Sequence, residues 1–185
     1  GLGLTAAGFG AWSERLVAAM SEHQPSIVVV VVGANDAAGF VSPPIDEVGS
    51  LAWRTEYRRR VGVVVDIATA GGARLIWVGA ANVTDPALVA PIAVQNEVVA
   101  AAVADRTGTI FVDAWRRFST LIPAGDESSI ALAGEVFDDR DGTTKAVRDS
   151  DETGTTLNRA GQRILAALIA DAVDTALVAL GADLP

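Results

Sequence analysis

The sequence contains no cysteine and only one histidine among its 185 residues. Without cysteine the chain can form neither a disulfide nor a thiolate metal site, and it offers no thiol nucleophile. Histidine, the most common general base near neutral pH, is present only as His23. This residue lies at the predicted end of a helix, just before Pro25, and we expect it to be remote from any catalytic centre.

Positive charge is scarce as well, since 14 lysine and arginine residues face 23 acidic ones and the formal net charge is −9. A negative field opposes binding to phosphate backbones and anionic lipid, so we expect no nucleic-acid partner. Half of the residues are hydrophobic, yet no apolar run approaches the roughly 20 residues that a membrane span needs. The composition therefore predicts one domain over residues 1–185 with no membrane span, and leaves the cellular compartment unknown.

The most informative stretch that is present is a run of six β-branched residues, Ile27 to Val32, followed by Gly33-Ala34-Asn35-Asp36. β-Branched residues favour strands, and a run without polar alternation indicates burial of both faces. We therefore predict a central strand of a parallel sheet. Open α/β sheets hold their ligands at the carboxyl ends of the strands, so Asn35 is the first candidate for a functional site. Asp36 is expected to hold the loop by accepting backbone amides.

Helix and strand patterns alternate along the first two thirds of the chain. Apolar periodicity and helix-ending residues predict helices over 11–23, 51–69 and 86–105, and strands over 27–32, 74–79 and 109–112. Asn158 is expected to cap a last helix over 159–180. Connections of this length require parallel pairing with crossover helices, which predicts a three-layer α/β/α sandwich with a flavodoxin-like parallel sheet.

Two segments differ from the rest of the chain in amino-acid composition. Residues 37–50 and 119–157 are rich in proline, glycine and short polar residues, and we expect a loop and an irregular excursion there. One hairpin is predicted to turn at 138–142, whose aspartates miss the spacing of a calcium loop. The chain offers no phosphate-binding loop for a nucleotide-binding flavodoxin-like module, and no cofactor or metal is expected.

Several motifs, in order from end to end, resemble the SGNH or GDSL-like hydrolase superfamily, in particular its bacterial branch. The central one is Gly33-Ala34-Asn35-Asp36 after the strand. Trp53 with Tyr57 and then Ile76-Trp77-Val78-Gly79 are similar to the helix and strand that follow in that branch. The pair Gly3-Leu4 ahead of Trp12 is similar to the second block of the family, and Leu157-Asn158-Arg159-Ala160-Gly161 is similar to the segment after its catalytic histidine.

The resemblance implies a role for some of these residues. In the family a serine attacks an ester carbonyl, a nearby Asp-x-x-His pair supplies the base, and an asparagine and a glycine amide donate to the oxyanion. Asn35 and Gly3 are the corresponding oxyanion donors here, and Gly1, Gly8 and Gly10 compete with Gly3 for its role. The substrate implied is a small-molecule ester or an acylated carbohydrate, and the family is often exported.

The sequence departs from the family pattern in two places. The first strand of the family and its Gly-Asp-Ser nucleophile correspond to residues before Gly1, so the domain is expected to be incomplete at its amino end. The exposed edge of the 27–32 strand would then need cover by a rearranged segment, a partner chain or residues beyond this chain. In addition, Thr156 occupies the position of the catalytic histidine. Asp151 or Asp149 then corresponds to the acid of the Asp-x-x-His pair, but without the histidine that this acid would orient.

Three functions follow from these patterns. The first is an SGNH-like domain that has lost hydrolase chemistry and serves in binding or scaffolding, because a threonine hydroxyl cannot act as a base near neutral pH. The second is an active esterase, acyl hydrolase or acyltransferase whose serine lies upstream, using another base or a water held by Asp149 or Asp151. The third is the nucleotide-binding module.

Overall fold

The computed structural model describes residues 3–32, 34–37, 39–41, 44–45, 47–83, 85–119, 135–138, 143–146 and 156–181. Its main sheet has the strand order β1-β4-β5, and all three strands run parallel. The strands are β1 (Ile27–Val31), β4 (Arg74–Val78) and β5 (Thr109–Val112). Each strand is joined to the next by a segment that contains a helix, as parallel pairing requires.

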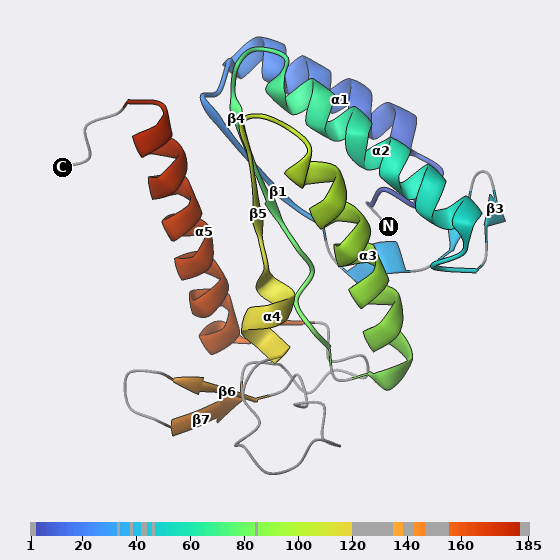
Figure 1. Ribbon diagram of the computed structural model, residues 1–185, viewed down its shortest axis with the longest axis vertical. Coiled ribbons are helices and arrows are strands. Elements are labelled where there is room, and N and C mark those ends of the chain that lie inside the picture. Colours follow the sequence, from blue (N-terminus) through green and yellow to red (C-terminus); the bar gives the residue numbers. More distant parts are fainter. Residues whose placement is uncertain are drawn as a thin grey trace.

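Helices cover both faces of the sheet (Figure 1). On one face lie α1 (Phe9–His23), α2 (Leu51–Thr69) and α3 (Pro86–Ala104), which share a core with Val30, Leu75 and Trp77. On the other face α5 (Arg159–Ala179) packs on Ile76, Val78 and Val112. The chain is therefore an α/β protein with a parallel sheet between two helical layers, and the predicted fold class is confirmed.

The helix boundaries follow from capping side chains that the sequence already shows. Ser50 accepts the amide of Trp53 at the start of α2, and Asp85 accepts that of Ala87 at the start of α3. The side chain of Asn158 accepts two amides, from Ala160 and Gly161, which begins α5 where it was predicted. These caps are the reason that α2, α3 and α5 begin at their predicted residues, whereas α1, which has no side-chain cap, begins two residues earlier than predicted.

The prediction of a central strand with both faces buried over Ile27 to Val32 is wrong. Among the described residues β1 lies at an edge of the main sheet and β4 is central. Side chains of β1 on the α1 and α2 face are covered, but on the α5 face Val29 is 39 % and Val31 is 59 % exposed. The reason is that α5 packs over β4 and β5, so it does not cover the carboxyl-terminal half of β1.

The segments predicted as irregular contain some regular structure. Residues 37–50 include a short antiparallel pair, β2 (Phe40–Val41) and β3 (Pro44–Ile45), and the 3₁₀ helix η1 (Ala34–Ala37) precedes it. A further helix, α4 (Ala114–Ser119), was not predicted; Asp113 accepts the amide of Arg116 in its first turn.

The predicted hairpin at 138–142 is confirmed, because β6 (Glu135–Asp138) pairs antiparallel with β7 (Thr143–Ala146). Within the predicted excursion, residues 120–134, 139–142 and 147–155 lie outside the described residues.

The helix α3 is apolar around much of its circumference. By length and composition alone it is also long and hydrophobic enough to cross a membrane, although a third of its most apolar window is buried inside the protein. It contacts α2, β5 and η1, which is the position of a core helix in an α/β sandwich. Because core helices pass the same hydropathy test, the absence of a membrane span stays a prediction.

Candidate functional site

The turn η1 after β1 places two neighbouring residues in opposite environments. Asn35 is exposed to solvent, whereas Asp36 is fully buried. Since β1 runs into this turn, both residues lie at the carboxyl end of the sheet, the edge at which parallel α/β proteins hold ligands (Figure 1). The structure thus leaves the side chain of Asn35 accessible at the edge predicted for it, while its role as an oxyanion donor stays a prediction.

Asp36 holds the amino-terminal segment in place from inside the protein. One of its carboxylate oxygens accepts the backbone N–H of Thr5 at 3.3 Å and the hydroxyl of Thr5 at 3.5 Å, and the other accepts the hydroxyl of Tyr57 at 3.1 Å. The expectation that Asp36 accepts backbone amides is confirmed, and the partner is the segment that contains Gly3.

Burial and hydrogen bonding act in opposite directions on the charge of Asp36. Burial raises the pKa of its carboxyl group above 3.8, and the donors from Leu4, Thr5 and Tyr57 partly offset this effect. For Tyr57, burial first and the negative charge of Asp36 second raise the pKa of the phenol well above 10.0. Tyr57 therefore remains a proton donor toward the carboxylate over the whole physiological range.

Gly3 is the one glycine of the amino-terminal segment for which the structure shows a steric need. A Cβ atom at this position would collide with Oδ1 of Asp36 and would lie 3.1 Å from its Cγ. At Gly8 and Gly10, by contrast, nothing lies within 4 Å of such an atom. Among the described glycines that compete for the role of the second block, Gly3 alone must lack a side chain to pack against Asp36.

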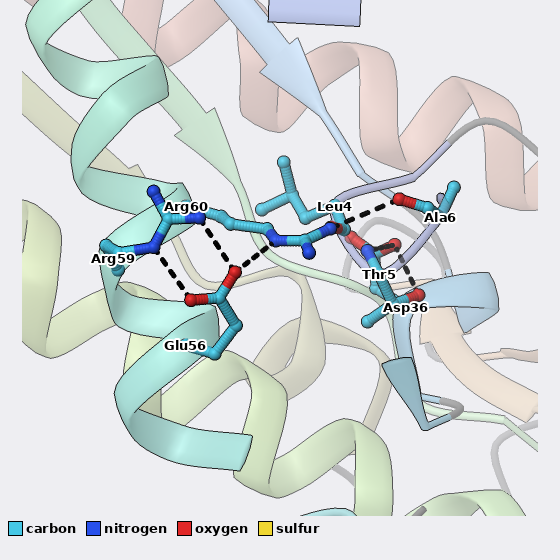
Figure 2. Close-up of polar contacts among 7 residues, drawn as sticks. All are labelled: Leu4, Thr5, Ala6, Asp36, Glu56, Arg59 and Arg60. Carbon is cyan, nitrogen blue, oxygen red and sulfur yellow. Dashed lines mark hydrogen bonds and ion pairs between the residues drawn. The ribbon is translucent and has the colours of Figure 1, made fainter. Parts of the chain in front are cut away.

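The same segment is held from its other side by Arg60 of α2 (Figure 2). Nη1 of Arg60 donates to the carbonyl oxygens of Leu4 at 2.6 Å and Ala6 at 3.1 Å, while Nε donates to Glu56 at 2.7 Å. The guanidinium carbon lies 5.0 Å from the ring centre of Phe9 and 4.7 Å from that of Phe40. Arg60 is only 4 % exposed, so these partners replace the water that would otherwise stabilise its positive charge.

Glu56 lies between two arginines one turn along the same helix. Arg59 donates to both of its carboxylate oxygens at 2.7 Å, and Arg60 donates to one of them. The hydrogen bonds from Arg59 are the largest effect on the pKa of Glu56, and burial opposes them. Together with the smaller effects of the hydrogen bond from Arg60 and of the two positive charges, they lower this pKa from 4.5 to about 2. Glu56 therefore carries a full negative charge next to the buried guanidinium at all ordinary pH values.

Sequence reasoning did not single out Arg60 or Glu56. The signal was present, because Arg60 follows Trp53 by seven positions and Tyr57 by three and so falls on the same buried stripe of the helix. Trp53 and Tyr57 are completely buried, as predicted for core residues, and their rings stack at 4.5 Å. A charged residue on such a stripe indicates a specific partner inside the fold.

The loop after β4 also lies at the carboxyl edge of the sheet, and a side chain of α3 binds its backbone. The side-chain amide of Asn96 on α3 both accepts from the N–H and donates to the C=O of Ala80, each at 2.8 Å. A Cβ at Gly79 would lie 2.8 Å from the ring of Phe111 and 3.1 Å from Oδ1 of Asn96. Close packing against Phe111 and Asn96 is thus a sufficient reason for the glycine of the Ile-Trp-Val-Gly motif.

The predicted base position lies at the start of α5. Thr156 is exposed and precedes the capping residue Asn158 by two positions. The opposite end of α5 lies near the start of β4, where Arg74 donates to the carbonyl of Ala179, so Thr156 is at the carboxyl edge of the sheet. Asp149 and Asp151 lie outside the described residues. His23 ends α1 directly ahead of β1 and is therefore at the opposite edge of the sheet, as expected.

No metal cluster marks this edge in the part of the chain that is described. No group of three or more acidic or histidine side chains is arranged to hold a metal ion there. A surface hollow of about 840 Å³ lies between the carboxyl ends of α1 and α2, next to Met20, Pro25 and Ile67. It is at the amino edge of the sheet, and neither Asn35 nor Gly3 lines it.

Comparison with known proteins places the chain in a family but gives no activity. Residues 1–172 match the model of a family described as "Protein of unknown function (DUF459)". No curated protein matches the chain at a significant level. Because the match covers far more than half of the sequence, the chain belongs to the DUF459 family of proteins of unknown function.

Proposed function

We propose that this chain is an SGNH-hydrolase-like domain that binds the carbonyl group of a small-molecule ester or acylated carbohydrate without hydrolysing it. The proposal combines the sequence resemblance with two features of the carboxyl edge of the sheet. One is an oxyanion-type pair of donors, Asn35 and Gly3. The other is the residue at the position of the general base, Thr156.

The binding half of the proposal is supported by the environment of the two donors. Asn35 presents an exposed side-chain amide in the turn after β1, and Gly3 belongs to a segment that Asp36, the neighbour of Asn35, binds through the backbone amide and the hydroxyl of Thr5. Preorganised N–H donors of this kind stabilise a carbonyl oxygen on which negative charge develops. The same donors also bind the neutral carbonyl of an ester, more weakly.

The observation that carries the loss of catalysis is the threonine at position 156. It lies where the resemblance places the catalytic histidine, just ahead of the cap of α5. A hydroxyl group does not accept a proton near neutral pH, and general base catalysis contributes about 10²–10⁴-fold to such reactions. An active hydrolase would need another base, such as a water held by Asp149 or Asp151, and is the alternative that the experiment tests.

Two measurements test this function: the first uses the protein together with any residues encoded upstream of Gly1, where the alternative places the serine, and the second uses the 185-residue protein. Incubation with p-nitrophenyl acetate and with a fluorophosphonate probe is expected to give no turnover above the buffer rate and no labelled serine. Titration with triacetin, followed by ¹H–¹⁵N NMR, is expected to shift the side-chain amide of Asn35 and the backbone amide of Gly3. A labelled serine or turnover above the buffer rate would overturn the loss of catalysis, and unshifted amides would overturn the binding role.

Asn35→Asp provides the matched control, because it keeps the size of the side chain and replaces its donor by an acceptor. The triacetin-induced shift of Gly3 should then disappear, while the thermal midpoint changes little because position 35 is exposed. A large fall of the midpoint would instead assign Asn35 a structural role in the turn.

A further inference from the structure

We propose that Arg60 and Asp36 are positioning residues, which hold the backbone of residues 3–6 from two opposite sides and thereby fix the Gly3 amide relative to η1. Residues 3–6 are called the glycine loop below. The inference rests on the proposed oxyanion role of Gly3 and extends it, because it names the groups that keep this donor in place. Neither residue contacts the substrate in this proposal.

On one side of the glycine loop, the carboxylate of Asp36 binds hydrogen-bond donors of the loop. Asp36 accepts the backbone N–H and the hydroxyl of Thr5 (Figure 2). Its second oxygen is held by Tyr57, so the carboxylate cannot rotate away without losing a buried partner. Gly3 packs directly against this carboxylate, which leaves no room for a side chain at position 3.

On the other side of the glycine loop, the guanidinium of Arg60 binds carbonyl groups of the loop. Arg60 donates to the carbonyl groups of Leu4 and Ala6, so the peptide group that joins Leu4 to Thr5 is bound at its C=O by Arg60 and at its N–H by Asp36. The side chain of Leu4 is 1 % exposed and packs in the same core as Phe9. A peptide group that is held at both its C=O and its N–H and that follows a buried side chain has little freedom, and this restricts the neighbouring residue Gly3 as well.

The chemistry of Arg60 explains why another cation would not serve equally. Its planar guanidinium uses Nε toward Glu56 and Nη1 toward two carbonyls while its faces lie against Phe9 and Phe40. A lysine ammonium is a single donor centre that cannot present this fork or stack between two rings. The structure also contains a natural comparison, because Arg59 binds Glu56 as well but is 58 % exposed along its side chain.

The experiment compares Arg60→Met with Arg59→Met, since each removes one arginine from Glu56 and only the first removes a partner of the glycine loop. Hydrogen exchange by NMR is followed at the amides of Leu4 and Thr5 and, as a reference for global opening, at Val99 in the core of α3. Loss of charge-assisted hydrogen bonds should speed exchange at Leu4 and Thr5 by about ten- to a hundredfold in Arg60→Met. Arg59→Met should leave it within about twofold.

The outcomes separate a positioning role from a merely structural one. Faster exchange at Leu4 and Thr5 with Val99 unchanged, together with a displaced Gly3 amide resonance, supports the inference. Equal acceleration at all three sites, or none in the glycine loop, overturns it. Arg60→Lys serves if Arg60→Met does not fold, and is expected to give an intermediate acceleration at Leu4 and Thr5; wild-type exchange in this variant overturns the inference. Failure of the proposed function is distinct, since it appears as absence of a triacetin response in the wild-type protein.

Discussion

At the scale of single residues, the site is built from pairs in which one member faces solvent and its neighbour faces the core. Asn35 and Asp36 are adjacent, yet the first is exposed and the second is buried against Thr5 and Tyr57. The role of Asp36 was predictable, because an aspartate after a strand commonly accepts nearby amides. The role of Arg60 was not, since its partners are carbonyl groups more than fifty positions away, and backbone acceptors leave no mark on a sequence.

Gly3→Ala tests the packing at this scale. The added methyl group collides with a carboxylate that is itself held by Thr5 and Tyr57, so we expect a loss of about 1–3 kcal/mol in the free energy of unfolding. Gly10→Ala is the matched control, because this glycine lies in α1 with open space around it. Alanine there should stabilise the protein by about 0.5–1 kcal/mol. Urea unfolding of both variants decides the point, and equal effects would contradict the steric argument.

At the scale of elements, most boundaries were predictable from periodicity and caps. The range of α2 agrees with the prediction, and Asn158 begins α5 as expected. The errors concern features that depend on neighbours. The exposure of β1 depends on how much of the strand α5 covers, and this helix follows β1 by more than a hundred residues in the sequence. The short helix α4 and the pair β2 and β3 contain too few residues for a periodic pattern to appear.

The helix α2 provides a prediction about pH through Glu56. Its pKa is lowered from 4.5 in the unfolded chain to about 2, so its contribution to stability is complete above pH 4.5 and is lost as pH falls toward 2. Glu56→Gln removes this contribution, and we expect a cost of about 1–2 kcal/mol at pH 7, because Arg60 keeps only a neutral acceptor. Urea unfolding at pH 7, 4 and 2.5 should show the gap between variant and wild type closing. A gap that is the same at all three values would contradict the prediction.

The comparison with the variant is needed because Asp36 responds to pH in the opposite sense. Its pKa is raised in the native state, so the folded protein binds this proton more tightly than the unfolded chain. The part of the stability that depends on Asp36 is therefore largest below its ordinary pKa of 3.8 and decreases as pH rises through the raised native value. The pH profile of the wild type alone sums both effects, whereas the difference from Glu56→Gln isolates the carboxylate on α2.

At the scale of the whole molecule, the exposed side of β1 is the feature with the widest effect. This strand contains no charge, proline or bulge, and within the described part of the chain nothing pairs with its outer edge. Edges of this kind pair readily with other strands. Whether a partner chain, a rearranged segment or residues beyond this chain cover it stays a prediction.

Val31→Lys tests this edge, because Val31 is 59 % exposed and its replacement leaves the core intact. We expect the 185-residue protein to self-associate at micromolar concentration and the variant to shift toward the monomer, since an edge lysine opposes strand pairing. Light scattering after size-exclusion chromatography measures the effect. Val178→Lys, on the exposed side of α5, is the control and should leave the association of the wild type unchanged.

The division of the core by the sheet has a practical consequence for protein engineering. Among the described residues, the cluster under α1, α2 and α3 and the cluster under α5 share no buried side chain, and the strands of the sheet lie between them. Combinatorial libraries can therefore vary the inner face of α5 while the packing around Arg60 is retained. A fluorophore or an affinity handle attached along the outer surface of that helix would report on the domain from a distance, without entering the compartment that contains the glycine loop.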